Sequence, residues 1–311
     1  MIKKIALILP VISGAMWGSA GIFVRTLQDF GFDKYTVISS KMILTAIILF
    51  TCIAMAKKEL LKVKIKDFWM FIGSGFVGMV LLNFGYNAAV EQLTLSFAAV
   101  LLSLSPVFVM CLAAVFFKEK ITPKKIVCTF MAVTGCTMVS GLLEGGSLAD
   151  AGAGGIILGL SAAFFYATYT LFSKALMKKG YNVFTVIFYS TLIAGVVLVP
   201  FTDWTVIGSF MEAAPVEHSV FMVVYAVGTA ILPYVLYTMA MNHADAGKVA
   251  ILGAGGEPSA AMIFGCIFFG EIPSLVSIAG LVITIAALTF ICMPEKEEKC
   301  VAVNTGLAQN A

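Results

Sequence analysis

The chain has 311 residues, of which 60% are hydrophobic and only 12% are charged, and its formal net charge is +3. An average soluble domain has about 25% charged residues, so this composition excludes an ordinary soluble protein. The apolar residues form runs of about 20, which is the length of a helix that crosses a bilayer. We therefore predict an all-α membrane protein.

Ten apolar segments have the length of membrane-spanning helices. In chain order they cover residues 5–27, 35–56, 67–90, 93–117, 124–143, 154–177, 182–200, 218–242, 246–269 and 274–293. The first segment follows Met-Ile-Lys-Lys, which resembles the start of a secretory signal. Its apolar stretch is longer than the core of a usual signal, and nine spans follow it, so we predict a retained helix.

Seventeen of the 20 basic residues fall on one side of the membrane when the ten spans alternate in direction. Runs of lysine follow the second, fourth and sixth spans, and the longest run lies at 57–66. The opposite loops are acidic and contain Asp29, Glu91, Glu144 and Asp203. By the positive-inside rule, we predict a multi-pass protein of the inner (cytoplasmic) membrane with both termini in the cytoplasm.

A block of sequence occurs twice, with an offset of 152 residues. Pro106, Phe116, Phe117 and Glu119 recur as Pro258, Phe268, Phe269 and Glu271. Five spans per copy is an odd number, so the second copy is inverted, as in many secondary transporters. We predict two inverted five-helix repeats at 1–143 and 154–293. An external linker over 144–153 joins them, and a disordered cytoplasmic tail over 294–311 follows.

Glu257 is an acidic residue deep inside the ninth span, next to Pro258 and after three glycines within 253–256. Because proline removes a backbone donor, we expect a kink that directs the carboxyl group into a cavity. An ionisable group at bilayer depth is a functional hypothesis by default. Glu257 would bind a cationic amine or exchange protons; alternatively, it is a protonated carboxyl bonded to a carbonyl that the proline frees. Ser105 holds the same place before Pro106, the second predicted kink.

Polar and aromatic side chains at mid-span positions are the other candidates for a substrate site. Asn83, Tyr86 and Asn87 share one face of the third span at i, i+3, i+4 spacing. The aromatic candidates on other spans are Trp17, Tyr166, Tyr169, Tyr234 and Tyr237. Rings with a hydrogen-bonding tip suit an amphipathic organic substrate. The asparagines equally suit hydrogen bonds between helices, and the aromatic residues equally suit helix packing.

Glycine pairs open the first helix of each predicted repeat, at Gly14 and Gly18 and at Gly155 and Gly159. Small residues at this spacing let helices approach closely in lipid. In a transporter, the same smooth surfaces would also let the two halves move past each other.

Other charged residues favour structural roles. Lys41 and Arg25 lie near the outer boundary, where long side chains reach water, and His243 with Asp245 suits a loop pair. The seven cysteines contain no C-x-x-C pair, and the basic residues lie in short loops between spans. We therefore predict no metal site, no cofactor and no nucleic-acid partner.

The pair Trp17-Gly18, a basic residue in the second span and Pro-x₁₂-Glu in both the fourth and ninth spans resemble the drug/metabolite transporter superfamily. The ten spans and Glu257-Pro258 resemble its EamA-type members, from about residue 5 to 293. The resemblance implies that helices one, three, four, six, eight and nine line a central cavity. It also implies export or exchange of amino acids, related metabolites or amphipathic drugs. The family pattern has arginine where this chain has Lys41.

We therefore predict a secondary transporter that exports small amphipathic organic solutes by alternating access, as a monomer or homodimer among membrane lipids. Proton-coupled efflux of cationic drugs is the alternative, with protons as a second partner. A membrane-embedded enzyme is disfavoured, because neither of the two histidines pairs with a nucleophile inside the bilayer. A receptor is disfavoured because the loops are short.

Overall fold

The computed structural model describes residues 2–93, 95–145, 152–270 and 272–293. All regular structure in these ranges is helical. The middle of the predicted linker, Glu271 and the predicted tail over 294–311 lie outside the described residues.

The first half contains five membrane-spanning segments, several of which are built from more than one helix. Its elements are α1 (Ile2–Gly18), α2 (Ala20–Asp29), α3 (Lys34–Ala56), η1 (Lys58–Leu61), η2 (Ile65–Asp67), α4 (Phe68–Ile72), the π-helical η3 (Gly73–Leu81), α5 (Leu82–Gln92), α6 (Leu95–Leu102), α7 (Ser105–Phe117), α8 (Pro123–Val139) and α9 (Leu142–Gly145).

The second half follows the same plan. Its elements are α10 (Ala153–Lys178), α11 (Val183–Leu198), η5 (Val199–Phe201), α12 (Trp204–Ala213), α13 (Pro215–Ala226), the π-helical η6 (Val227–Ile231), α14 (Leu232–Ala240), α15 (Ala246–Phe269) and α16 (Leu275–Cys292).

Nine helical segments in the described ranges are at least 18 residues long and apolar enough to cross a membrane. The remaining predicted span is α8, which has 17 residues. At 1.5 Å per residue it is about 26 Å long, slightly less than the hydrocarbon core of a typical bilayer. The ten predicted spans thus correspond to nine long segments and one shorter helix, which packs along α16.

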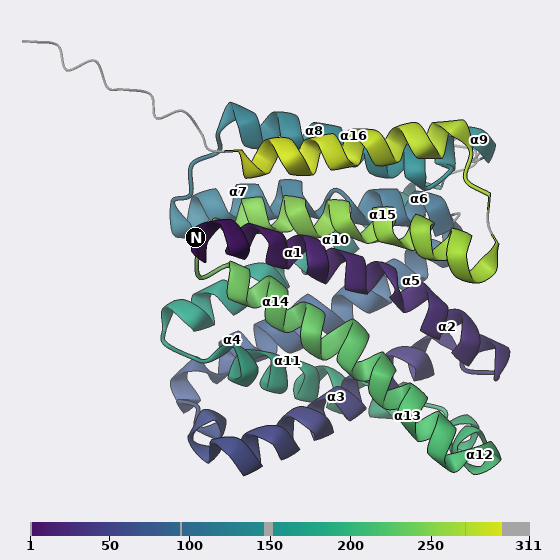
Figure 1. Ribbon diagram of the computed structural model, residues 1–311. Coiled ribbons are helices and arrows are strands. Elements are labelled where there is room, and N and C mark those ends of the chain that lie inside the picture. Colours follow the sequence, from purple (N-terminus) through teal and green to yellow (C-terminus); the bar gives the residue numbers. More distant parts are fainter. Residues whose placement is uncertain (1, 94, 146–151, 271, 294–311) are drawn as a thin grey trace, which may run out of the picture.

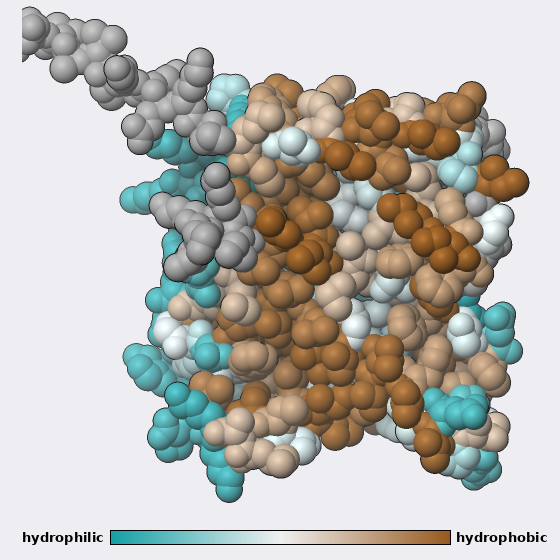
Figure 2. Space-filling view, in the orientation of Figure 1, coloured by the Kyte–Doolittle hydropathy of each residue, from teal (hydrophilic) through white to brown (hydrophobic). Residues whose placement is uncertain are grey.

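The spans run between two ends of the molecule (Figure 1). The start of α1 and the end of α16 lie at one end, and α9 lies at the other, close to where the second half begins. The second repeat therefore crosses in the opposite direction to the first. Apolar side chains cover the middle of the face shown in Figure 2, and polar side chains gather at the two ends. This arrangement is that of a protein surrounded by lipid.

The doubled block of sequence is also repeated in the backbone. The cap residues of α7 and α15, Lys118 and Gly270, are both left-handed, with φ of 56° and 64°. The hydroxyls of Thr122 and Ser274 then accept backbone N–H groups at the starts of α8 and α16. Each pair is separated by the same 152 residues as Pro106 and Pro258. The block is therefore a helix, a left-handed turn and a capped helix in both halves.

The two predicted proline kinks differ in the structure. Pro106 is the second residue of α7 and follows an interruption between α6 and α7. Pro258 lies inside α15, which continues as one helix from Ala246 to Phe269. The fourth span is therefore interrupted, whereas the ninth is a continuous helix that contains its proline.

The third span of each half contains a π-helical segment. η6 covers 227–231, which the 152-residue offset places on 75–79, inside η3. π-helical turns are rare and are frequently found at functional sites. This matching pair was not predicted from the sequence.

Replacing Lys118 with glycine should stabilise the protein by about 1 kcal/mol, because a side chain in the left-handed region is strained and glycine is not. Thermal unfolding of the purified protein in detergent measures the change. The opposite substitution, Gly270→Lys, should lower the melting temperature. Equal melting temperatures for Lys118→Gly and the native chain would contradict the expected strain.

Candidate substrate cavity

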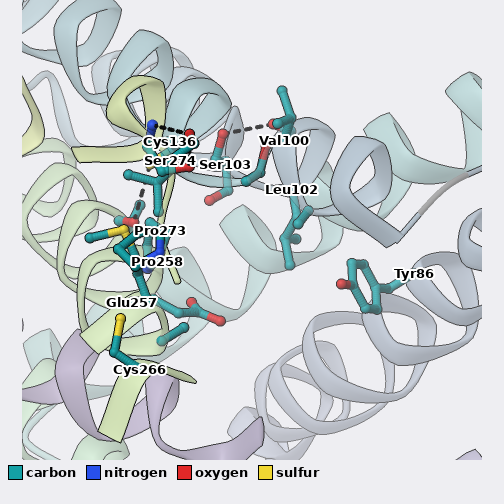
Figure 3. A pocket seen from close by; sticks show the side chains of 18 of the residues that line it. Tyr86, Val100, Leu102, Ser103, Cys136, Glu257, Pro258, Cys266, Pro273 and Ser274 are labelled. Carbon is teal, nitrogen blue, oxygen red and sulfur yellow. Dashed lines mark hydrogen bonds between the residues drawn. The ribbon is translucent and has the colours of Figure 1, made fainter. Parts of the chain in front are cut away.

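A cavity of about 490 Å³ opens into the bundle (Figure 3). Residues of α2, α5, α6, α7, α8, α10, α15 and α16 line it, together with Ile272, Pro273 and Ser274. These last residues connect α15 to α16 at the end opposite the lysine-rich loops. The cavity therefore opens toward the end that carries the acidic loops.

Four of the residues predicted from the sequence line this cavity: Tyr86, Tyr166, Glu257 and Pro258. Glu257 is carried by α15, and the phenol of Tyr86 on α5 points into the cavity from the other side (Figure 3). Ser105, which precedes Pro106 as Glu257 precedes Pro258, lines the same space. The repeat thus brings two related positions to one cavity, and only one of them has a carboxyl group.

The other predicted aromatic residues form a cluster with Tyr166. The ring of Trp17 lies 6.3 Å from that of Tyr166, 5.3 Å from that of Tyr234 and 5.4 Å from that of Tyr237. The Tyr169 ring is 5.1 Å from the Tyr234 ring. We call these five residues the aromatic cluster. Within it Tyr166 lines the cavity, whereas Tyr169 and Tyr237 are fully buried.

Hydrogen bonds fix the cluster between α10 and α14. The Tyr237 hydroxyl lies 3.1 Å from Thr170 Oγ1, and the Tyr169 hydroxyl lies 3.4 Å from Thr238 Oγ1. The family resemblance implies that the eighth span, formed by α13, η6 and α14, lines the cavity. In the structure this span carries Tyr234 and Tyr237 of the aromatic cluster and none of the lining residues. Instead, α8 and α16 contribute lining residues, among them Cys136 and Ser277.

The two asparagines of the third span lie away from the cavity lining. Asn83 Nδ2 donates to the carbonyl oxygen of Met79 at 2.7 Å, one turn earlier in the same span. The amide nitrogen of Asn87 is buried and has no hydrogen-bond partner among the described residues. Of the three residues predicted to share a face, only Tyr86 reaches the cavity.

Two basic residues that the sequence places at the outer boundary lie close to this site. Arg25 on α2 is part of the cavity lining. Lys41 interacts electrostatically with Glu257, and its Nζ is 5.3 Å from the centroid of the Tyr225 ring. Lys41 is the eighth residue of α3, about 10 Å from the end of that helix. This depth is the signal that could have associated it with Glu257.

Glycines hold Glu257 close to α1. A Cβ atom on Gly14 would overlap with the carbonyl oxygen of Gly253, and one on Gly18 would overlap with that of Glu257. A Cβ on Gly256 would lie 2.8 Å from the carbonyl oxygen of Val11. The two helices therefore meet backbone to backbone, as small residues allow in lipid. This contact sets the position of Glu257 at the cavity.

Histidine, cysteine and acidic side chains form no group of three or more that could hold a metal ion in the part of the chain that the structure describes. A helical bundle in two inverted repeats, with an open cavity and a carboxyl group between them, has the architecture of a secondary transporter.

Comparison with known proteins identifies the family. The model of the EamA-like transporter family matches residues 4–141 and again residues 153–293. The chain belongs to this family of membrane transporters. It is 24% identical over 287 residues to the uncharacterized transporter YxxF of Bacillus subtilis, covering 92% of this chain and 89% of that protein.

An uncharacterized transporter of Archaeoglobus fulgidus is 26% identical over 280 residues, covering 90% of this chain and 95% of its own length. One solved crystal structure superposes with a TM-score of 0.74 at 13% sequence identity, covering 92% of this chain and 95% of that one. This last likeness shows that the fold is shared.

The α1–α15 contact predicts the effect of added volume. Gly18→Ala places a methyl group against the backbone of α15 and should destabilise the protein by about 1–3 kcal/mol. Gly21→Ala is the matched control, because nothing lies within 4 Å of a Cβ at that position. Thermal unfolding in detergent compares the two variants. The close contact is refuted if both melt at the same temperature.

Proposed function

We propose that the protein exports small amphipathic organic solutes, such as amino acids or related metabolites, from the cytoplasm by alternating access. The observation that carries this proposal is the position of Glu257 in a cavity that is open at the end opposite the lysine-rich loops. With those loops in the cytoplasm, the cavity faces outward and both termini face inward. The repeats at 1–143 and 154–293 would be the two halves that move.

The chemistry of the lining supports an amphipathic solute. Glu257 would bind an ammonium group, and the phenols of Tyr86 and Tyr166 would contact the rest of the molecule. Aromatic faces attract cations and also bury apolar surface. The volume of about 490 Å³ lies within the usual range for small-molecule sites. Trp17, Tyr169, Tyr234 and Tyr237 would close the path beyond the solute until the cluster separates.

One observation favours a second candidate, proton-coupled efflux of cationic drugs. Lys41 interacts electrostatically with Glu257, so the carboxylate already has a positive neighbour. A proton or a solute cation that reaches Glu257 would then compete with the charge of Lys41. Under this candidate, proton entry and solute release would alternate at one carboxyl group.

Replacing Glu257 with glutamine should lower solute efflux roughly tenfold or more, because the neutral amide loses the charge-assisted hydrogen bond to an ammonium group. The measurement is flux of labelled amino acids and of a cationic dye in proteoliposomes. The matched control is Glu212→Gln, an exposed residue of α12.

An imposed proton gradient separates the two candidates. Only the proton-coupled mechanism predicts that the gradient drives dye efflux and that Glu257→Gln removes this dependence. Full flux in Glu257→Gln, with the same response to pH as the native chain, would exclude both roles of the carboxyl group.

A further inference from the structure

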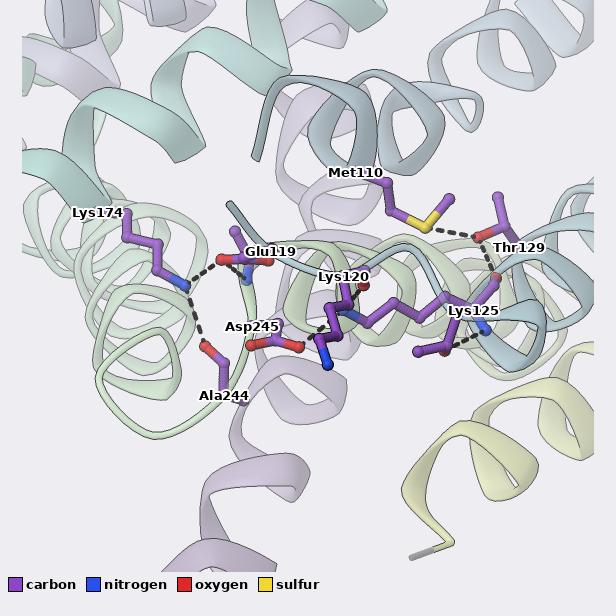
Figure 4. Close-up of polar contacts among 10 residues, drawn as sticks. Met110, Glu119, Lys120, Lys125, Thr129, Lys174, Ala244 and Asp245 are labelled. Carbon is purple, nitrogen blue, oxygen red and sulfur yellow. Dashed lines mark hydrogen bonds and ion pairs between the residues drawn. The ribbon is translucent and has the colours of Figure 1, made fainter. Parts of the chain in front are cut away.

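Two ion pairs lie together at the lysine-rich end of the bundle (Figure 4). Lys174 Nζ is 2.6 Å from Glu119 Oε1, and Lys125 Nζ is 2.7 Å from Asp245 Oδ2. The side chains of Lys174 and Glu119 are each 9% exposed, and that of Lys125 is 4% exposed. Three of the four charges are therefore largely removed from water, unlike those of ordinary surface ion pairs, whereas the side chain of Asp245 is 54% exposed.

Both ion pairs join the first repeat to the second. Glu119 and Lys125 belong to the connection after α7 and to α8, whereas Lys174 is on α10 and Asp245 directly precedes α15. Backbone groups strengthen the same junction. Glu119 Oε1 accepts the backbone N–H of Ala246 at 3.1 Å, and Lys174 Nζ donates to the carbonyl oxygen of Ala244 at 3.4 Å. The four side chains thus tie α7, α8, α10 and α15 together.

The charges of the two pairs also act on each other. Burial by itself would raise the pKa of Asp245, but the hydrogen bond and charge of Lys125, with the charges of Lys174 and Lys248, hold that pKa below its usual value. Asp245 therefore remains ionised at neutral pH.

The ion pairs lie beyond the aromatic cluster as seen from the cavity. Lys174 follows Tyr166 by eight residues on α10, which is about 12 Å along the helix. Asp245 precedes Glu257 by twelve residues and therefore lies about 18 Å from it along α15, also toward the lysine-rich end. A solute in the cavity that moves toward the lysine-rich side must therefore pass the aromatic cluster and then this junction.

The open end of the bundle has no equivalent pair at the matching positions. The 152-residue offset places Ser277 opposite Lys125 and Leu93 opposite Asp245. Ser277 lines the cavity instead of bridging the repeats through a charge. The inverted repeats are therefore tied by this ion pair at one end only.

We propose that Glu119, Lys125, Lys174 and Asp245 form an inner gate, which holds the cavity closed on the lysine-rich side and separates each time the cavity opens to that side. The inference rests on the proposed alternating access and concerns its regulation. The gate favours the outward-open arrangement, because its contacts exist only when the inner ends of the helices are together.

The gate is suited to opening as well as to closing. Buried ion pairs lose much of their attraction to the cost of desolvation, so their separation costs less than the contacts alone suggest. Moreover, Glu119 Oε2 is buried and accepts no hydrogen bond from any described residue. Opening would return this oxygen to water, which offsets part of the lost contacts.

Thiol labelling tests the gate without any transported solute. In a chain whose seven native cysteines are replaced, Thr170→Cys puts a thiol one helical turn before Lys174, at a position that is 0% exposed. A membrane-impermeant maleimide is added to the lysine-rich side in inside-out vesicles. Lys174→Gln should raise the labelling rate roughly tenfold, as expected when a hydrogen bond between charged groups is removed from one of two states.

Lys179→Gln is the matched control. Lys179 directly follows the same helix, and its pair with Asp67 also joins the two repeats at the lysine-rich end. Asp67 directly precedes the third span, which packs along α10, so this pair lies outside the group of four side chains that forms the gate. Lys179→Gln should leave the labelling rate unchanged. The double variant Glu119→Gln/Lys174→Met leaves no unpaired buried charge in the Lys174–Glu119 pair and should also raise the labelling rate. It replaces Lys174→Gln in the test if that variant does not fold.

Labelling of Cys266 from the opposite side at the native rate, in a chain that retains only this native cysteine, shows that each variant keeps the folded cavity, since Cys266 lines it. The gate is overturned if Lys174→Gln and the double variant, both folded, label at the Lys179→Gln rate. Failure of the proposed transport would appear in the flux of Glu257→Gln and would leave the labelling result unaffected.

Discussion

Three charged side chains that this bundle withdraws from water each have an opposite charge that acts on them, and the cost of desolvation is the constraint that makes this necessary. Glu257 has Lys41, Glu119 has Lys174, and Lys125 has Asp245. Each of these interactions joins segments that are far apart in the sequence. Because an ionised group cannot remain buried alone, the partners limit how far the helices can move. The same pairing therefore positions the cavity and closes the end beyond it.

The architecture is symmetric, whereas its chemistry is not. Both halves have a left-handed turn after the fourth helix and a π-helical segment in the third. The charged groups break this symmetry, since Ser105 matches Glu257 and Ser277 matches Lys125. If the two halves had the same charged groups, a cavity open at one end of the bundle and a cavity open at the other would have equal free energy. The unequal charges supply a reason for the cavity to open at one end.

The fold follows from the sequence because hydropathy and loop charge act along the chain. Runs of about 20 apolar residues give the spans, and the lysine runs give the inversion. The cavity was only partly predictable. Tyr86, Tyr166 and Glu257 line it, but Trp17, Tyr169, Tyr234 and Tyr237 pack together beside it. Mid-span depth cannot separate these groups, because lining depends on how helices rotate against one another. The depth of Lys41 in its span could have suggested an acidic partner, but only the helix packing identifies that partner as Glu257.

The left-handed turns after α7 and α15 have a consequence for biosynthesis. Gly270 adopts this conformation without strain, whereas Lys118 adopts it at a cost in backbone energy. Lys118 lies in the lysine-rich loops, where positive charge directs the orientation of neighbouring helices during insertion. At the turn after α7, the left-handed backbone favours glycine, whereas a positively charged loop favours lysine. The chain has glycine at the turn on the acidic side and lysine at the turn on the basic side, so the strained residue is the one that adds positive charge to its loop.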